Sequence, residues 1–86
     1  MNNKESTKKL WHTIGNLVKD LDELELDNGE GKAIVVLAQI YLTKIKGRLY
    51  EVAIEKGWLT GLQAELSKHN VQIELARLKE ELIKCA

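Results

Sequence analysis

Residues 33–42 read Ala-Ile-Val-Val-Leu-Ala-Gln-Ile-Tyr-Leu, a stretch that would be apolar on nearly every face of a helix. It is shorter than the ~20 apolar residues that a membrane-spanning helix requires, so it fits a buried central helix instead. A buried β-strand is the alternative interpretation, but the chain contains no second strand-like run to pair with it. We therefore predict a central helix over residues 29–56, with neighbours on every side of its apolar stretch.

The sequence on both sides of this stretch predicts two more helices, over residues 6–26 and 61–84. The chain has no proline and only 6 glycines, a composition that favours long helices. Helices of these lengths are longer than a compact globule of 86 residues is wide, so the fold must be elongated or shared with another chain. The predicted fold class is all-α, an elongated antiparallel three-helix bundle that forms a single domain over residues 1–86.

Turn signals mark both ends of the central helix. Asp27 and Glu30 have the spacing of a capping box, with Asp27 as the N-cap residue. Gly57 is typical of a left-handed helix stop, and Trp58 follows it where a Schellman motif places its apolar contact. The central helix is therefore expected to lie between two defined turns.

Apolar residues of the first predicted helix recur in steps of four and three, which is a heptad pattern. They are Leu10, Ile14, Leu17, Leu21 and Leu24. Trp11 and Val18 widen this stripe on one side, as packing in a globular bundle requires. The pattern lasts only about two heptads, which is too short for a stand-alone coiled coil.

The third predicted helix changes its apolar face partway along. One face carries Leu59, Leu62, Leu66 and Ile73, and the nearly opposite face carries Val71, Leu75, Leu78, Leu82 and Cys85. Either the helix breaks near Asn70 to give a fourth short helix, or its end packs on a second chain. An exposed stripe of leucines is an aggregation hazard in a monomer. We therefore predict that the second set forms the self-association interface of a homodimer.

The charge balance argues against a nucleic-acid-binding protein. The chain has 13 basic and 13 acidic residues, so its formal net charge is zero. Lys44, Lys46 and Arg48 keep one alternative open, a DNA-binding transcriptional regulator that uses this part of the central helix. Residues 46–50, Lys-Gly-Arg-Leu-Tyr, resemble the recognition helix of TetR-type helix-turn-helix proteins, which implies DNA contact. Because Glu51 lies at pairing distance from Arg48 on the same helix face, we favour a self-neutralised surface.

Two groups of residues are candidates for binding a partner protein. Trp11 and Trp58 fall near the same end of an antiparallel bundle, where they form either a binding hot spot or a lid on the core. Asp20, Asp22 and Glu23 belong to a run of acidic residues without a basic one. This run fits either a docking face for a basic partner or a solvated helix end.

The sequence contains no recognisable catalytic or metal-binding pattern. His12 and His69 lie in different predicted helices, and the single Cys85 can neither form an internal disulfide nor complete a cysteine-based zinc site. We expect a non-enzymatic, cytoplasmic protein without a cofactor or metal and outside the membrane. Its expected role is that of a regulator, inhibitor or assembly adaptor, acting through homodimerisation and binding of another protein.

Overall fold

The computed structural model describes residues 3–24, 26 and 29–85. They form three helices: α1 (Lys4–Asp22), α2 (Gly29–Glu55) and α3 (Gly61–Cys85). No strand occurs among these residues, which confirms the predicted all-α class and the number of helices. α1 ends at Asp22, four residues earlier than predicted, and the predicted N-cap Asp27 lies outside the described residues.

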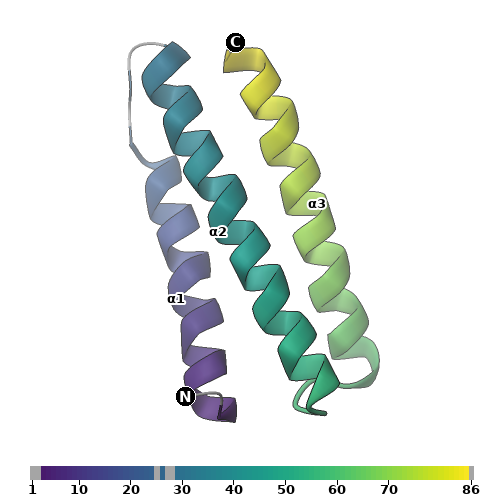
Figure 1. The fold of residues 1–86 in the computed structure, drawn as a ribbon. Helices are drawn as coiled ribbons and strands as arrows, with labels where there is room; N and C mark the ends of the chain where they lie inside the picture. Colours follow the sequence, from purple (N-terminus) through teal and green to yellow (C-terminus); the bar gives the residue numbers. More distant parts are fainter. Residues whose placement is uncertain (1–2, 25, 27–28, 86) are drawn as a thin grey trace.

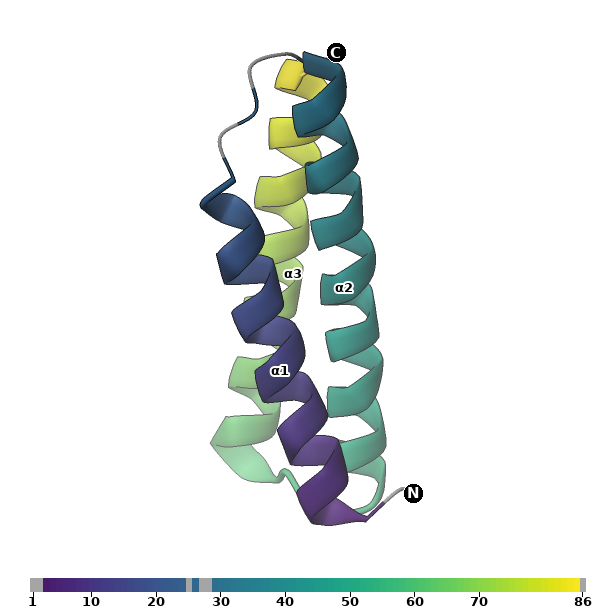
Figure 2. The ribbon, with the colours of Figure 1, turned by 90° about the vertical axis from the view of Figure 1, so that its left-hand side faces the viewer.

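α2 is the central helix, with α1 and α3 running antiparallel to it (Figure 1). Both outer helices pack against α2, but no Cα atom of α1 comes within 8 Å of a Cα atom of α3. The result is an open, elongated bundle with extents of 43 × 22 × 15 Å, and Figure 2 shows its narrow side. None of the helices in the described part of the chain is long and apolar enough to cross a membrane.

The turn between α2 and α3 has the predicted Schellman geometry. The backbone N–H of Trp58 donates to the carbonyl of Ala53 at 2.8 Å, and that of Gly57 donates to the carbonyl of Ile54 at 3.1 Å. Gly57 has a φ of 77°, a left-handed conformation that residues with a side chain rarely adopt. The predicted helix stop at Gly57 is therefore confirmed.

Leu78 is the centre of the packing between α2 and α3. It is fully buried and forms a core cluster with Val36 and Ile40 of α2. The partly buried residues packed against this cluster are Leu75, Leu82 and Cys85. Closer to the turn, a Cβ atom added at Gly47 would lie 3.1 Å from Val71 Cγ1, so Val71 also faces α2.

The prediction that this stripe of α3 faces away from the chain's own core is therefore wrong. All five residues, Val71, Leu75, Leu78, Leu82 and Cys85, lie against α2, so this stripe packs within the chain. The opposite set is the exposed one, with 74% exposure at Leu62, 48% at Leu66 and 53% at Ile73. Leucines occur on both faces of α3, and the face with the longer heptad run is the buried one. α3 continues through Asn70 without a break, so the predicted alternative of a fourth helix after Asn70 is wrong for residues 61–85.

Amide exchange is expected to be slowest in the middle of α2, at Val36 and Ile40. Both residues are nearly inaccessible to solvent, and opening their hydrogen bonds requires α3 to separate from α2. Hydrogen–deuterium exchange followed by NMR measures this directly, with Leu62 near the start of α3 as the internal comparison. Faster exchange at Val36 than at Leu62 would contradict the arrangement with α2 at the centre.

Candidate functional site

One side of α1 and α2 exposes large apolar side chains. On α2 the three most exposed are Ile34, Tyr41 and Ile45, which are 61%, 62% and 50% exposed. On α1 they are Leu10 and Leu17, which are 41% and 44% exposed. We call these five residues the outer face.

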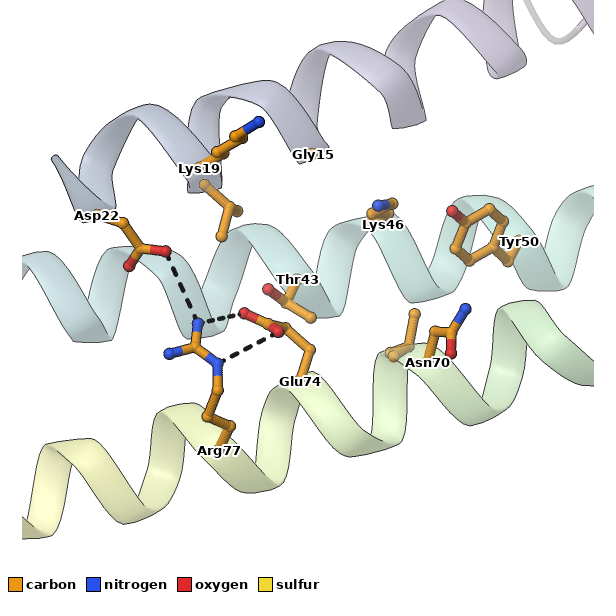
Figure 3. Close-up of a pocket in the computed structure, with 11 residues that line it drawn as sticks. Gly15, Lys19, Asp22, Thr43, Lys46, Tyr50, Asn70, Glu74 and Arg77 are labelled. Atoms are coloured by element: carbon orange, nitrogen blue, oxygen red, sulfur yellow. Dashed lines mark hydrogen bonds and ion pairs between the residues drawn. The ribbon is translucent and has the colours of Figure 1, made fainter.

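The outer face is one surface because its residues on both helices turn away from the same groove. This groove lies between α1 and α3 over α2, with a cavity of about 380 Å³, and Lys19 and Tyr50 line it (Figure 3). At about 100° per residue, Tyr41 lies roughly 180° from Tyr50 around α2, and Leu17 lies roughly 160° from Lys19 around α1. Since α1 packs alongside α2, the two sets of apolar residues are neighbours on the side opposite the groove.

The apolar stretch 33–42 therefore has neighbours on only two of its sides. Val36 and Ile40 are buried on the α3 side, and Gln39 is buried on the α1 side. Ile34 and Tyr41 remain uncovered, although the sequence predicts neighbours all round. The accessible surface of the chain is 6196 Å². A folded monomer of 9.8 kDa exposes about 5,200 Å² on average, so this chain leaves roughly 1,000 Å² more than usual in contact with water.

A buried amide holds α1 onto α2. Gln39 is only 2% exposed, and its Nε2 donates to the Val18 carbonyl at 2.9 Å and to Asp22 Oδ1 at 2.7 Å. Buried amides normally have hydrogen-bond partners of this kind. Sequence reasoning missed this contact, although Gln39 is the one polar residue in the stretch 33–42.

Replacing Gln39 with leucine is expected to lower the free energy of unfolding by about 1–2 kcal/mol. The two hydrogen bonds to α1 are lost, one of them to a carboxylate, while the side-chain volume is nearly kept. Chemical denaturation measures the change. A more stable Gln39→Leu protein would show that apolar contact, and not the amide, holds α1 in place.

The two tryptophans lie at the same end of the bundle, as expected. Trp11 is 8% exposed, and its ring centroid lies 5.1 Å from that of Tyr50. Trp58 is partly buried, and its ring carries the Lys56 ammonium 5.5 Å from the centroid. Trp11, Tyr50 and Trp58 all line a cavity of about 420 Å³, which we call the Trp-end cavity.

The acidic candidates lie near the opposite end of α1, so the structure does not bring them together with the tryptophans. Asp20 and Glu23 are exposed to solvent. Asp22 accepts the Gln39 hydrogen bond and lies 3.9 Å from Arg77 Nη2 of α3. Asp22 is thus engaged within the chain, which leaves Asp20 and Glu23 as the more available pair.

Arg77 spans the groove between α1 and α3 (Figure 3). Its guanidinium lies 2.6 Å from Glu74 Oε1 and 3.2 Å from Glu81 Oε2, in addition to the contact with Asp22. The hydrogen bond with Glu74 raises the pKa of Arg77, helped by the charges of all three carboxylates and opposed by partial burial. Three acidic neighbours neutralise this arginine, so it is not a free site for an anion.

The basic residues of α2 do not form one patch. The Lys46 ammonium lies over the Tyr50 ring at 5.7 Å and faces the groove. Lys44 lies 5.7 Å over Tyr41 on the outer side, and Arg48 pairs with Glu51 at 2.8 Å. Lys46 therefore points to the side of α2 opposite Lys44 and Arg48, which share one face where Glu51 pairs with Arg48.

Among the described residues, no group of three or more His, Cys, Asp or Glu side chains could hold a metal ion. No protein-family model matches the chain, and the comparisons with curated proteins and with solved structures found no match either. Function is therefore inferred from the surfaces described above.

Proposed function

We propose that the protein is a small, non-enzymatic protein-interaction module that works as a homodimer, with the outer face as the dimer interface. In this role it acts on a protein partner in the cytoplasm as a regulator, inhibitor or assembly adaptor. The supporting observation is the outer face itself, five large apolar side chains that are each at least 41% exposed. Large apolar side chains that are exposed on one side of a protein are typical of a protein–protein interaction site.

The amount of uncovered surface favours a second copy of the chain as the occupant. The excess of roughly 1,000 Å² over an average monomer is close to the ~800 Å² per partner that a stable interface buries. A two-fold dimer is also the commonest way in which a chain covers its own apolar patch. The interface would combine α1 and α2 of each copy into a core of four helices.

Charges at the edge of the outer face favour an antiparallel arrangement of each helix with its own copy. Lys9 and Asp20 flank the face on the same side of α1, because they lie about 80° and 60° from Leu17 around the helix. A two-fold axis perpendicular to the helices and close to Ile45 places Lys9 of one copy near Asp20 of the other. A two-fold axis parallel to the helices would instead pack α1 on α2 of the other copy and would leave Lys9 and Asp20 at opposite edges of the interface, without this pairing.

Cysteine cross-linking tests both the interface and its direction. In a Cys85→Ser background, Ile45→Cys lies near the proposed axis and should form a covalent dimer rapidly on mild oxidation. Ile34→Cys should not couple to its own copy, because eleven residues from the axis place the two sulfurs about 30 Å apart along the helix. Ile73→Cys, which is equally exposed but lies on α3, is the matched control.

The outcomes separate the possible arrangements. Selective coupling of Ile45→Cys supports the proposal. Coupling of Ile34→Cys to itself would contradict the antiparallel arrangement. Equal coupling of Ile73→Cys and Ile45→Cys would mean that contacts are random, and the outer face would then not be an interface.

The DNA-binding alternative stays a prediction, and no observation on Lys44, Lys46 or Arg48 favours it. A titration with duplex DNA at low salt tests it, because contacts with phosphate are strongest there. Absence of binding at low salt would exclude a regulator that uses this part of α2.

A further inference from the structure

The Trp-end cavity lies outside the outer face and has the properties of a separate ligand site. It is formed between the first half of α1, the end of α2 and the start of α3, beside the Schellman turn. Its volume of about 420 Å³ is in the range of small-molecule sites in proteins, which is roughly 300–1,000 Å³. Trp11 and Trp58 both line it, so a bound molecule would contact two indole rings.

The walls of the cavity are aromatic and held in place. Trp11 is buried and packed on Tyr50 at a ring-centroid distance of 5.1 Å. The main chain at Trp58 is fixed by the hydrogen bond from its backbone N–H to the Ala53 carbonyl in the turn. Leu66, which is 48% exposed and has no role in the core, provides a further apolar wall. An apolar or aromatic body would therefore replace water on these surfaces at little cost in ordering.

The charged residues that line the cavity are both basic. Lys4 and Lys8 line it from α1 together with His12, and no Asp or Glu is among its lining residues. Lys4 and Lys8 form no ion pair with a carboxylate in the part of the chain that the structure describes. Lys56 does not line the cavity, but its ammonium lies 5.5 Å from the centroid of the Trp58 ring. A chain with zero net charge thus places two lysines that form no ion pair within its described part at the rim of one aromatic cavity.

We infer that the Trp-end cavity binds an organic anion that carries its charge on an aromatic or aliphatic body. The body would lie between the indole rings, and the anionic group would lie at the rim near Lys4 and Lys8. The same chemistry occurs in a free aromatic acid and in an acidic, aromatic segment of a protein. This inference does not depend on dimerisation, because the cavity and the outer face involve different residues.

A matched pair of probes tests the inference. 1-Anilinonaphthalene-8-sulfonate carries an anionic group on an aromatic body, and N-phenyl-1-naphthylamine is the same body without the charge. Because the chain has only two tryptophans, the indole N–H signals of Trp11 and Trp58 in a ¹⁵N NMR spectrum report on the cavity alone. The sulfonate is expected to shift both signals and to bind more tightly than the neutral probe.

Charge variants show whether the lysines make the difference. Lys8→Gln and Lys4→Gln should each weaken sulfonate binding by about threefold to fivefold and leave the neutral probe unchanged. Lys68→Gln is the control, since it removes the same charge from an exposed position of α3 that neither lines the cavity nor belongs to the outer face. Raising the salt concentration should weaken sulfonate binding in the wild type.

Two further arms complete the test. An unlabelled acidic, aromatic peptide and the free acid phenylacetate are compared on the same two indole signals, which distinguishes a protein segment from a free small molecule. The titration is repeated with the Tyr41→Glu, Ile45→Glu variant, so that loss of the dimer and loss of the cavity site are separated. Equal affinity for the two naphthalene probes, or indole signals that do not move at saturation, would overturn the inference and leave the proposed dimer unaffected.

Discussion

Replacing Leu78 with alanine is expected to lower the free energy of unfolding by about 3–5 kcal/mol. Leu78 is fully buried in the cluster with Val36 and Ile40, and its removal leaves a cavity between two long helices that cannot easily collapse. Small domains are stable by only about 5–15 kcal/mol, so much of the total would be lost. Chemical denaturation monitored by circular dichroism measures the change.

Leu62→Ala is the matched control, because it is the same substitution on the same helix at a side chain that is 74% exposed. It is expected to change the free energy of unfolding by less than about 0.5 kcal/mol. If the two variants lose similar stability, Leu78 would not be the centre of the packing between α2 and α3. If Leu62→Ala loses more stability than Leu78→Ala, the face of α3 that packs on α2 would be the opposite one.

The double variant Tyr41→Glu, Ile45→Glu is expected to weaken the homodimer by more than about 100-fold. In a symmetric dimer it places four carboxylates in an apolar interface, and burying an unpaired charge is strongly unfavourable. Both side chains are at least 50% exposed in the single chain, so the folded monomer should remain. Analytical ultracentrifugation measures the dissociation constant, and circular dichroism confirms that the helices persist.

The chain offers a closely matched control for this variant. Leu62→Glu, Ile73→Glu changes two equally exposed apolar residues in the same way, but on α3. It is expected to leave the dissociation constant of the dimer unchanged. Dissociation by the α3 pair, with no effect of the α2 pair, would place the interface on α3 and reject the outer face.

The helices and the turn at Gly57 could be predicted because their signals are local. A proline-free chain with one clear left-handed stop leaves few alternatives for where α2 ends. The early end of α1 at Asp22 could not be predicted, because the apolar pattern continues to Leu24 and Leu26 although the helix does not.

The pairing of faces could not be predicted from periodicity. In α1 the heptad residues Leu10 and Leu17 are about 40% exposed or more, while Trp11 and Val18, which only flank that pattern, are buried. A hydrophobic pattern shows which faces are apolar, but not which of two apolar faces meets a neighbour in the same chain. For this reason the self-association interface predicted on α3 is part of the core, and the uncovered face lies on α1 and α2.

The hydrogen bonds between Gln39 and α1 could be predicted only in part. A single amide within an apolar helix needs hydrogen-bond partners, because burying it without them is unfavourable, but the sequence does not show which residues those partners are. The Trp-end cavity could also be predicted only in part. Trp11 and Trp58 could be assigned to one end of the bundle from the sequence. The position of Lys4 and Lys8 beside them depends on how α1 lies along α2 and α3.

The mass of the free wild-type protein in solution tests the central claim most directly. Sedimentation equilibrium over a concentration series through the micromolar range measures it without any variant or label. If the outer face is a dimer interface, the average mass should rise from 9.8 kDa towards twice that value and stop there, because a two-fold interface closes on itself. A mass that stays at 9.8 kDa at the highest concentration would contradict the account.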